Sequence, residues 1–130
     1  MGATFGHDGV MPSVVLLLED SADTRSLLNL HLTKAGYEVL QAEDAIAAGK
    51  LVLERRPQVI IADIKLPYMN GDEFIAALRA DPAVRDIPVI FLSVDEHLAE
   101  HAKRLGAVAY FDKRVSPERL IEVVDLYARE

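Results

Sequence analysis

Residues 59–67 read Val-Ile-Ile-Ala-Asp-Ile-Lys-Leu-Pro, an apolar run that leads into an aspartate. The β-branched residues of this run predict a strand over 59–63, and its apolar character indicates that other elements cover both faces of that strand. Pro67 and the Asn70-Gly71 pair predict a loop after it. We therefore expect Asp63 at the carboxyl end of a buried strand, the edge at which open parallel sheets bind ligands.

Four further runs of this kind lie on either side, and longer segments with helical periodicity alternate with them. The runs predict strands at Val14–Leu18, Glu38–Ala42, Val89–Ser93 and Val108–Phe111. Helices are expected at about 22–35 and 44–56, after the Asn70-Gly71 loop up to the stop at Asp81-Pro82, through Leu98, Ala102 and Leu105 before Gly106, and from Pro117 onward. Because right-handed crossovers connect parallel strands, the helices should cover both faces of the sheet. The pattern predicts an α/β fold, a doubly wound three-layer sandwich, but does not determine the strand order.

Local signals support two of the helix boundaries. Gly36 suits the left-handed turn that follows a helix. Ser116 is expected to cap the last helix, and Pro117 to occupy its first position. The spacing i, i+3, i+4, i+7 predicts that this helix buries Leu120, Val123, Val124 and Tyr127.

The composition limits the classes of function. The chain has 130 residues and a formal net charge of −7, from 14 Lys and Arg against 21 Asp and Glu. This length suits one domain, which we assign to residues 13–130, with residues 1–12 as a flexible leader. The acidic balance argues against direct nucleic-acid binding, and the lack of Cys excludes disulfides and thiolate sites. No apolar run approaches the roughly 20 residues of a membrane helix, so we expect a cytoplasmic protein without membrane contact.

Polar residues stand at the carboxyl ends of four predicted strands. Glu19-Asp20 follow the first strand, Asp63 and Ser93 end the third and fourth, and Lys113 comes shortly after the fifth. Carboxylates gathered at one edge need a counter-charge, and carboxylate oxygens with a backbone carbonyl and water suit Mg²⁺. With a metal-bound phosphate nearby, Asp63 could act as a nucleophile that forms an acyl phosphate. The hydroxyl and the ammonium would then stabilise charge on the transferring group.

In this order and at strand ends, these residues resemble the receiver domain of bacterial two-component response regulators. The likeness extends over about Val14 to Tyr127 and implies a flavodoxin-like fold with five parallel strands in the order 2-1-3-4-5 and five helices. The metal ligands that it implies are Glu19, Asp20, Asp63 and the backbone carbonyl of Lys65. The residues that it implies for phosphorylation and switching are Asp63 as phospho-acceptor, Ser93 and Lys113 as stabilising groups, and Ser93 with Tyr110 as the switch.

The resemblance also implies partners. The chain would be a signalling phospho-acceptor rather than an enzyme, with a histidine kinase or a phosphotransfer protein as donor. Since 130 residues leave no room for an output domain, we expect output through an effector protein or through the remainder of a longer chain. The face formed by the fourth helix, the fifth strand and the fifth helix is the expected place for a weak homodimer. Val108-Ala109 replace acidic residues that often support such a dimer, which lowers this expectation.

Other classes of function fit the sequence less well. Val94 stands where the family usually has Ala or Gly, and Arg114 where it usually has Pro, so a degenerate receiver that acts only as an interaction module is the alternative. A nucleotide or flavin enzyme would need a glycine-rich phosphate loop, which is lacking. An aspartate phosphatase would need a second carboxylate where Lys65 stands. His97 and His101 have the i, i+4 spacing of a metal pair, but we expect both to be exposed to solvent.

Overall fold

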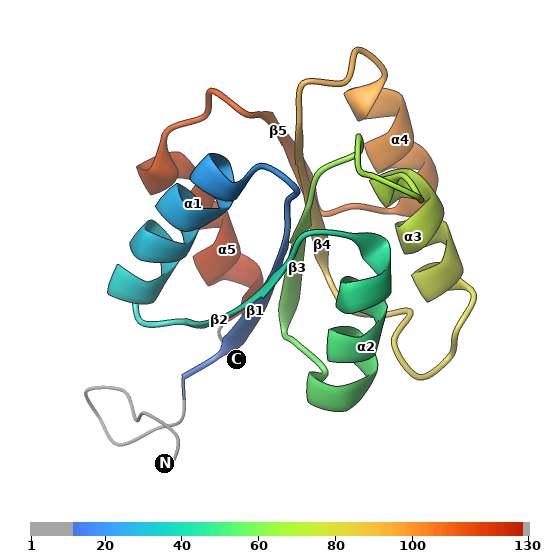
Figure 1. Ribbon diagram of the computed structural model, residues 1–130, viewed down its shortest axis with the longest axis horizontal. Helices are drawn as coiled ribbons and strands as arrows, with labels where there is room; N and C mark the ends of the chain where they lie inside the picture. The colour runs from blue at the N-terminus through green and yellow to red at the C-terminus, as the bar shows by residue number, and fades with distance from the viewer. Residues whose placement is uncertain (1–11, 129–130) are drawn as a thin grey trace.

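The computed structural model describes residues 12–128, which form one parallel sheet of five strands with helices between them (Figure 1). The strands are β1 (Val14–Leu18), β2 (Glu38–Ala42), β3 (Val59–Ala62), β4 (Val89–Ser93) and β5 (Ala109–Asp112). The helices are α1 (Ala22–Lys34), α2 (Ala45–Arg55), α3 (Gly71–Arg79), α4 (Leu98–Leu105) and α5 (Pro117–Ala128). The strand order is β2-β1-β3-β4-β5, which confirms the predicted fold. The predicted leader, except for its last residue, lies outside the described residues.

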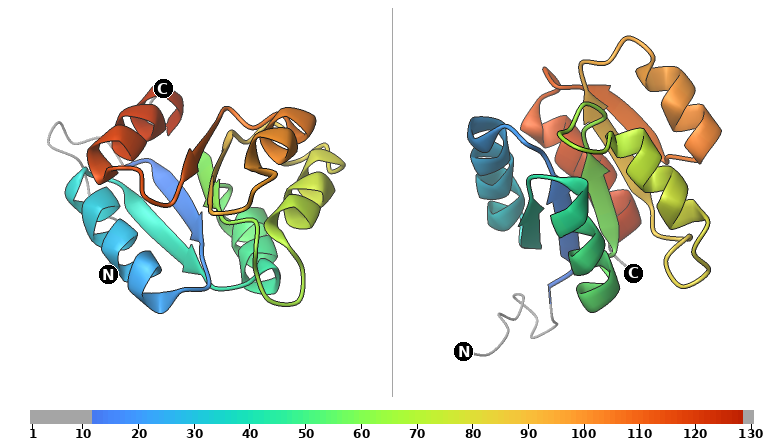
Figure 2. Two further views of the ribbon diagram at one scale, coloured as in Figure 1. Left: turned by 90° about the horizontal axis from the view of Figure 1, so that it is seen from above. Right: turned by 45° about the vertical axis from the view of Figure 1, so that its right-hand side comes forward.

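Helices cover both faces of the sheet, as the buried strands require. Helices α1 and α5 lie on one face, and α2, α3 and α4 lie on the other (Figures 1 and 2). Successive strand residues alternate between the two faces. Leu16, Ile60 and Phe91 therefore join the core under α2, α3 and α4, whereas Leu17 and Ile61 join the core under α1 and α5. The helices fix the sheet from both sides, so its carboxyl edge forms a rigid base for a site.

The helix ends follow the local signals in the sequence. The Ser21 hydroxyl accepts the Thr24 N–H at the start of α1, and Gly36, the second residue after the end of that helix, has φ +101°. Arg56 ends α2 in the left-handed region, with φ 45°. Pro57 accounts for the end of the helix, because a residue before proline avoids the right-handed helical conformation.

Three predicted boundaries or burials were wrong. Tyr127 is 36% exposed, whereas Ala128 is buried, because the stripe of α5 that meets the sheet runs through Leu120, Val124 and Ala128. Strand β5 begins and ends one residue later than predicted, and β3 ends at Ala62. Asp63 thus lies just beyond its strand, where its carboxylate is not part of the alternating core.

Candidate functional site

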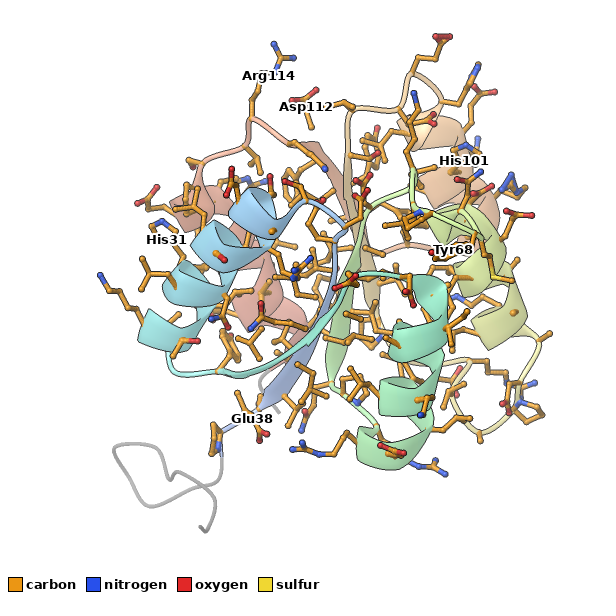
Figure 3. All side chains as sticks on the ribbon, in the orientation of Figure 1. His31, Glu38, Tyr68, His101, Asp112 and Arg114 are labelled. Atoms are coloured by element: carbon orange, nitrogen blue, oxygen red, sulfur yellow. The ribbon has the colours of Figure 1, made fainter. Side chains whose placement is uncertain are left out.

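The residues predicted for the site meet at the carboxyl edge of the sheet. Glu19 follows β1, and its N–H donates to the Ala42 carbonyl at 3.0 Å. Asp63 follows β3, and its N–H donates to the Leu18 carbonyl at 3.1 Å. The ladder of backbone hydrogen bonds therefore continues one residue past these strands and fixes both carboxylates. Figure 3 shows the same edge at the top, where Asp112 ends β5, with Glu38 at the opposite edge.

Three carboxylates form a cluster that could hold a cation. Glu19, Asp20 and Asp63 each place one oxygen within 4.8 Å of the others. Glu19 and Asp63 are 1% and 4% exposed, and Asp20 is exposed. This set of oxygen ligands, open to water on one side, fits Mg²⁺, which keeps part of its hydration shell.

Both oxygens of Asp63 have partners. Oδ1 accepts the Ser93 hydroxyl at 2.6 Å and the backbone N–H of Ile64 at 2.7 Å. A longer contact of 3.4 Å joins the Lys65 N–H to the same oxygen. Oδ2 lies 2.7 Å from Lys113 Nζ. These contacts hold the carboxylate in one orientation toward the open side of the cluster.

Lys113 supplies the counter-charge of the cluster. Its Nζ lies 2.9 Å from Glu19 Oε1 as well as near Asp63. Burial disfavours the charged ammonium, but the hydrogen bonds to Asp63 and Glu19 outweigh this effect and raise the pKa of Lys113. Burial raises the pKa of the Glu19 carboxyl, although Lys113 and the Ser21 N–H counteract the shift. For Glu19, the effect of burial therefore outweighs that of its hydrogen-bond partners.

Two further residues shape the site and were not predicted as part of it. Arg25 on α1 donates from Nη1 to the Glu19 carbonyl at 2.7 Å and so holds the loop after β1. Gly71 contacts the Asp63 backbone so closely that a Cβ there would lie 1.8 Å from the carbonyl oxygen. The sequence marked Gly71 only as a turn residue, and nothing in the spacing indicated Arg25.

The structure also places the other residues named from the sequence. Tyr110 is 50% exposed on β5, and Val94 is 62% exposed after β4. Arg114 pairs with Asp112, with 2.7 Å between Nε and Oδ1. His97 is exposed as expected (62% of its side chain). His101 is not: only 19% of its side chain is exposed, because it lies between carboxylates of two other segments.

The family model of the response regulator receiver domain matches residues 15–125. The chain belongs to this family. Chemotaxis protein CheV3 of Helicobacter pylori is 36% identical, over 85% of this chain and 40% of that protein. The phosphate regulon regulatory protein PhoB of Pseudomonas aeruginosa is 33% identical, over 82% of this chain and 48% of that protein. The polar-differentiation response regulator DivK of Brucella anthropi is 33% identical, over 90% of this chain and 97% of that protein. This receiver thus spans less than half of CheV3 and PhoB and nearly all of DivK.

Solved receiver domains have the same fold. The chemotaxis response regulator CheY4 of Vibrio cholerae superposes with a TM-score of 0.82 and 29% identity, over 90% of this receiver and 99% of that chain. The receiver domain of a histidine kinase from Syntrophus aciditrophicus gives a TM-score of 0.82 and 26% identity, over 89% of each chain. Within residues 12–128, no helix is long and apolar enough to cross a membrane.

Proposed function

We propose that this receiver takes a phosphoryl group onto Asp63 from a histidine kinase or a phosphotransfer protein, with Mg²⁺ bound, and that phosphorylation switches its contacts with other proteins. The observation that carries the proposal is the setting of Asp63. The residue is 4% exposed, Ser93 donates to Oδ1, and Lys113 pairs with Oδ2. A nucleophile in a fixed orientation beside a donor and a cation is suited to phosphoryl transfer.

The residues of the site divide the chemistry among them. A carboxylate oxygen of Asp63 forms a bond to phosphorus while the bond from phosphorus to the donor's imidazole nitrogen breaks, and the imidazole leaves. Lys113 and the Ser93 hydroxyl, both already in contact with Asp63, then donate to the phosphoryl oxygens. Mg²⁺ held by Glu19, Asp20, Asp63 and the Lys65 carbonyl would supply positive charge against the repulsion between carboxylates and phosphoryl group.

In the proposed reaction the receiver itself is the phosphorylated product, and it converts no separate substrate. The chain would act as a cytoplasmic signalling module, and its chemistry would be limited to its own phosphorylation and dephosphorylation. CheV3, PhoB and DivK are named for different processes. We propose that a phosphohistidine on a partner protein donates the phosphoryl group. Since these names differ, we leave the class of output open to either a separate effector protein or an attached output domain.

Phosphorylation can be tested by intact mass after incubation with Mg²⁺ and either acetyl phosphate or a phosphorylated histidine kinase. The wild type should gain one phosphoryl group, and Asp63→Asn should gain none, because it lacks the nucleophile. A phosphoryl group retained by Asp63→Asn would place the acceptor elsewhere. If the wild type gains none from either donor, the degenerate receiver is the correct alternative.

Metal binding can be tested separately by calorimetric titration with Mg²⁺. Asp20→Asn should bind Mg²⁺ about tenfold or more weakly, because it removes an anionic ligand. Asp23→Asn is a matched control, since Asp23 is an exposed carboxylate in the first turn of α1 outside the cluster. Equal affinities of wild type and Asp20→Asn would overturn the assignment of Asp20.

A further inference from the structure

His101 lies half-buried between α3 and α4, and carboxylates from two other segments face its ring. Nδ1 lies 3.5 Å from Asp72 Oδ2, and Nε2 lies 3.8 Å from Asp95 Oδ1. The side chains of these three residues are 19%, 18% and 14% exposed. Figure 3 shows His101 on the side of α4 toward α3. One imidazole therefore connects α4 with the start of α3 and with the loop between β4 and α4.

Both carboxylates stand next to groups that hold Asp63. The Asp95 N–H donates to Ser93 Oγ at 3.3 Å, and this hydroxyl donates to Asp63 Oδ1 at 2.6 Å. Asp72 directly follows Gly71, which contacts the Asp63 carbonyl. A shift of either segment in response to a modified Asp63 therefore changes the surroundings of the imidazole.

Helix α4 also borders the predicted switch residue. Ala99, Ala102 and Lys103 of α4 line the same hollow of about 640 Å³ as Tyr110. Tyr110 is 50% exposed in the present arrangement. The position of α4 therefore limits the room in which the Tyr110 ring can turn inward.

The charge of His101 decides which partners it holds. The charged groups that face it are Asp72 from α3, Asp95 from the loop and Arg104 from α4 itself. Arg104 Nη2 lies 3.1 Å from Nδ1, so the partners assign a neutral ring that accepts from Arg104 and carries its proton on Nε2, toward Asp95. A second proton on Nδ1 would exclude the Arg104 donor and point at Asp72. Arg104 Nη2 also lies 3.5 Å from Asp72 Oδ2, so α4 already has one ion pair to α3. Protonation of His101 adds an ion pair to Asp72 and another to Asp95, and so ties α4 more firmly to both segments.

We propose that His101 is a pH-dependent latch: its protonated form ties α4 to α3 and to the loop after β4, and so opposes the movement of α4 and Tyr110 that phosphorylation induces. This inference rests on the proposed function of Asp63. Histidine ordinarily changes its charge between about pH 5 and 8, so the latch would weaken the response of the receiver in acid. His101 is a positioning residue, since it touches neither Asp63 nor the metal ligands.

The test uses NMR of the full chain with Mg²⁺ and beryllofluoride as the phosphate mimic, at about pH 6 and 7.5. Amides beside Asp63 report binding of the mimic, and amides of α4 and β5 report the switch. In the wild type, the ratio of switched to resting protein should fall about two- to fivefold in acid, because switching must then break the half-buried ion pairs of protonated His101. His101→Gln should switch more completely than the wild type at pH 6 and show no such fall. His97→Gln is the matched control, since the His97 ring pairs with exposed Glu96 and Glu100, while its contact with Asp95 is made by the backbone N–H, which glutamine keeps; it should behave as the wild type.

The outcomes separate the two proposals. If the amides beside Asp63 do not respond in the wild type, the proposed function fails, and the latch loses the response that it would regulate. If they respond but His101→Gln keeps the pH dependence of the wild type, the latch alone is overturned. Amide exchange of α4 without Mg²⁺ or beryllofluoride tests the contact itself. Corrected for intrinsic rates, protection should be greater at pH 6 than at 7.5 in the wild type, and equal protection would also overturn the latch.

Discussion

Gly71 allows the start of α3 to lie against the backbone of Asp63. A Cβ at this position would lie 1.8 Å from the Asp63 carbonyl oxygen, so another side chain requires the backbone to move. We expect Gly71→Ala to lower the free energy of unfolding by about 1–3 kcal/mol, as overpacking does, and to weaken Mg²⁺ binding by displacing Asp63. Urea unfolding and calorimetric titration measure these two effects.

Gly49 in α2 offers a matched control, because a Cβ there would make only an ordinary contact of 3.9 Å with the Phe74 ring. Gly49→Ala should raise the free energy of unfolding by about 0.5–1 kcal/mol, since glycine is unfavourable inside a helix. The same gain from Gly71→Ala would show that the contact with Asp63 is not close.

The Glu19 carboxyl should make the stability of the metal-free receiver depend on pH, and the direction of its pKa shift gives the sign of this dependence. Burial raises its pKa above 4.5 in the folded chain, so the folded state binds this proton more readily than the unfolded state. Its contribution to stability is greatest below that value and is lost as the pH rises through the folded pKa. The stability of wild type relative to Glu19→Gln should therefore fall as the pH rises above 4.5. Urea unfolding of both proteins without Mg²⁺ measures the difference, and an increase with pH would contradict the assignment.

Single residues differ in how well the sequence revealed them. The positions of Glu19, Asp63 and Lys113 follow from the rule that parallel strands end at one edge, so periodicity was enough to bring them together. The contacts of Arg25 and Gly71 depend on the path of the backbone after each strand. That path is determined by packing of the whole domain, and no spacing in the sequence encodes it.

Among the elements, the partly buried guanidinium of Arg79 connects α3 with the end of α4 and with the loop before β4. Arg79 donates from Nε to the Leu105 carbonyl at 2.9 Å and from Nη1 to the Arg85 and Ile87 carbonyls at 2.8 Å each. The Leu105 carbonyl belongs to the last turn of α4, where the helix itself supplies no donor. We expect Arg79→Met to lower the free energy of unfolding by about 1–3 kcal/mol, because these carbonyls lose a charged donor.

Arg55 provides the comparison for Arg79. It makes an exposed ion pair with Glu38, with 42% and 38% of the two side chains exposed. Arg55→Met should therefore cost no more than about 1 kcal/mol. Thermal or urea unfolding of both variants checks the difference, and similar losses would show that the carbonyl contacts of Arg79 contribute nothing particular.

The strands were predicted closely because each is a short apolar or β-branched run. The bounds of β1, β2 and β4 agree with the prediction to the residue, whereas β3 ends one residue earlier and β5 is displaced by one. The place of a strand in the sheet does not explain these differences, since the correctly predicted β2 and the displaced β5 are both edge strands. In α5, periodicity alone could not distinguish Tyr127 from Ala128, because the contact line depends on how the helix crosses the sheet.

For the molecule as a whole, the proposed phosphorylation site and the hollow around Tyr110 lie in different places but share β4 and β5. Ser93 ends β4 opposite Asp112 of β5, and Tyr110 pairs with Phe91 in the same two strands. The hydroxyl of Ser93 is 2.6 Å from Asp63 Oδ1 and also accepts the Asp95 N–H. Ser93 is thus the side chain through which a change at Asp63 can reach the loop before α4.

Ser93→Ala should separate binding of the phosphate mimic from the response of the molecule. A hydrogen bond to a charged group contributes about 1.5–3 kcal/mol, enough to reverse a two-state balance of similar size. With Mg²⁺ and beryllofluoride, the wild type should show NMR shifts beside Asp63 and also in α4 and β5. Ser93→Ala should keep Mg²⁺ affinity and the shifts beside Asp63, since no metal ligand is altered, but lose most of those in α4 and β5. Ser26→Ala, at an exposed position on α1, should respond as the wild type. Undiminished shifts of α4 and β5 in Ser93→Ala would show that the signal leaves Asp63 by another path.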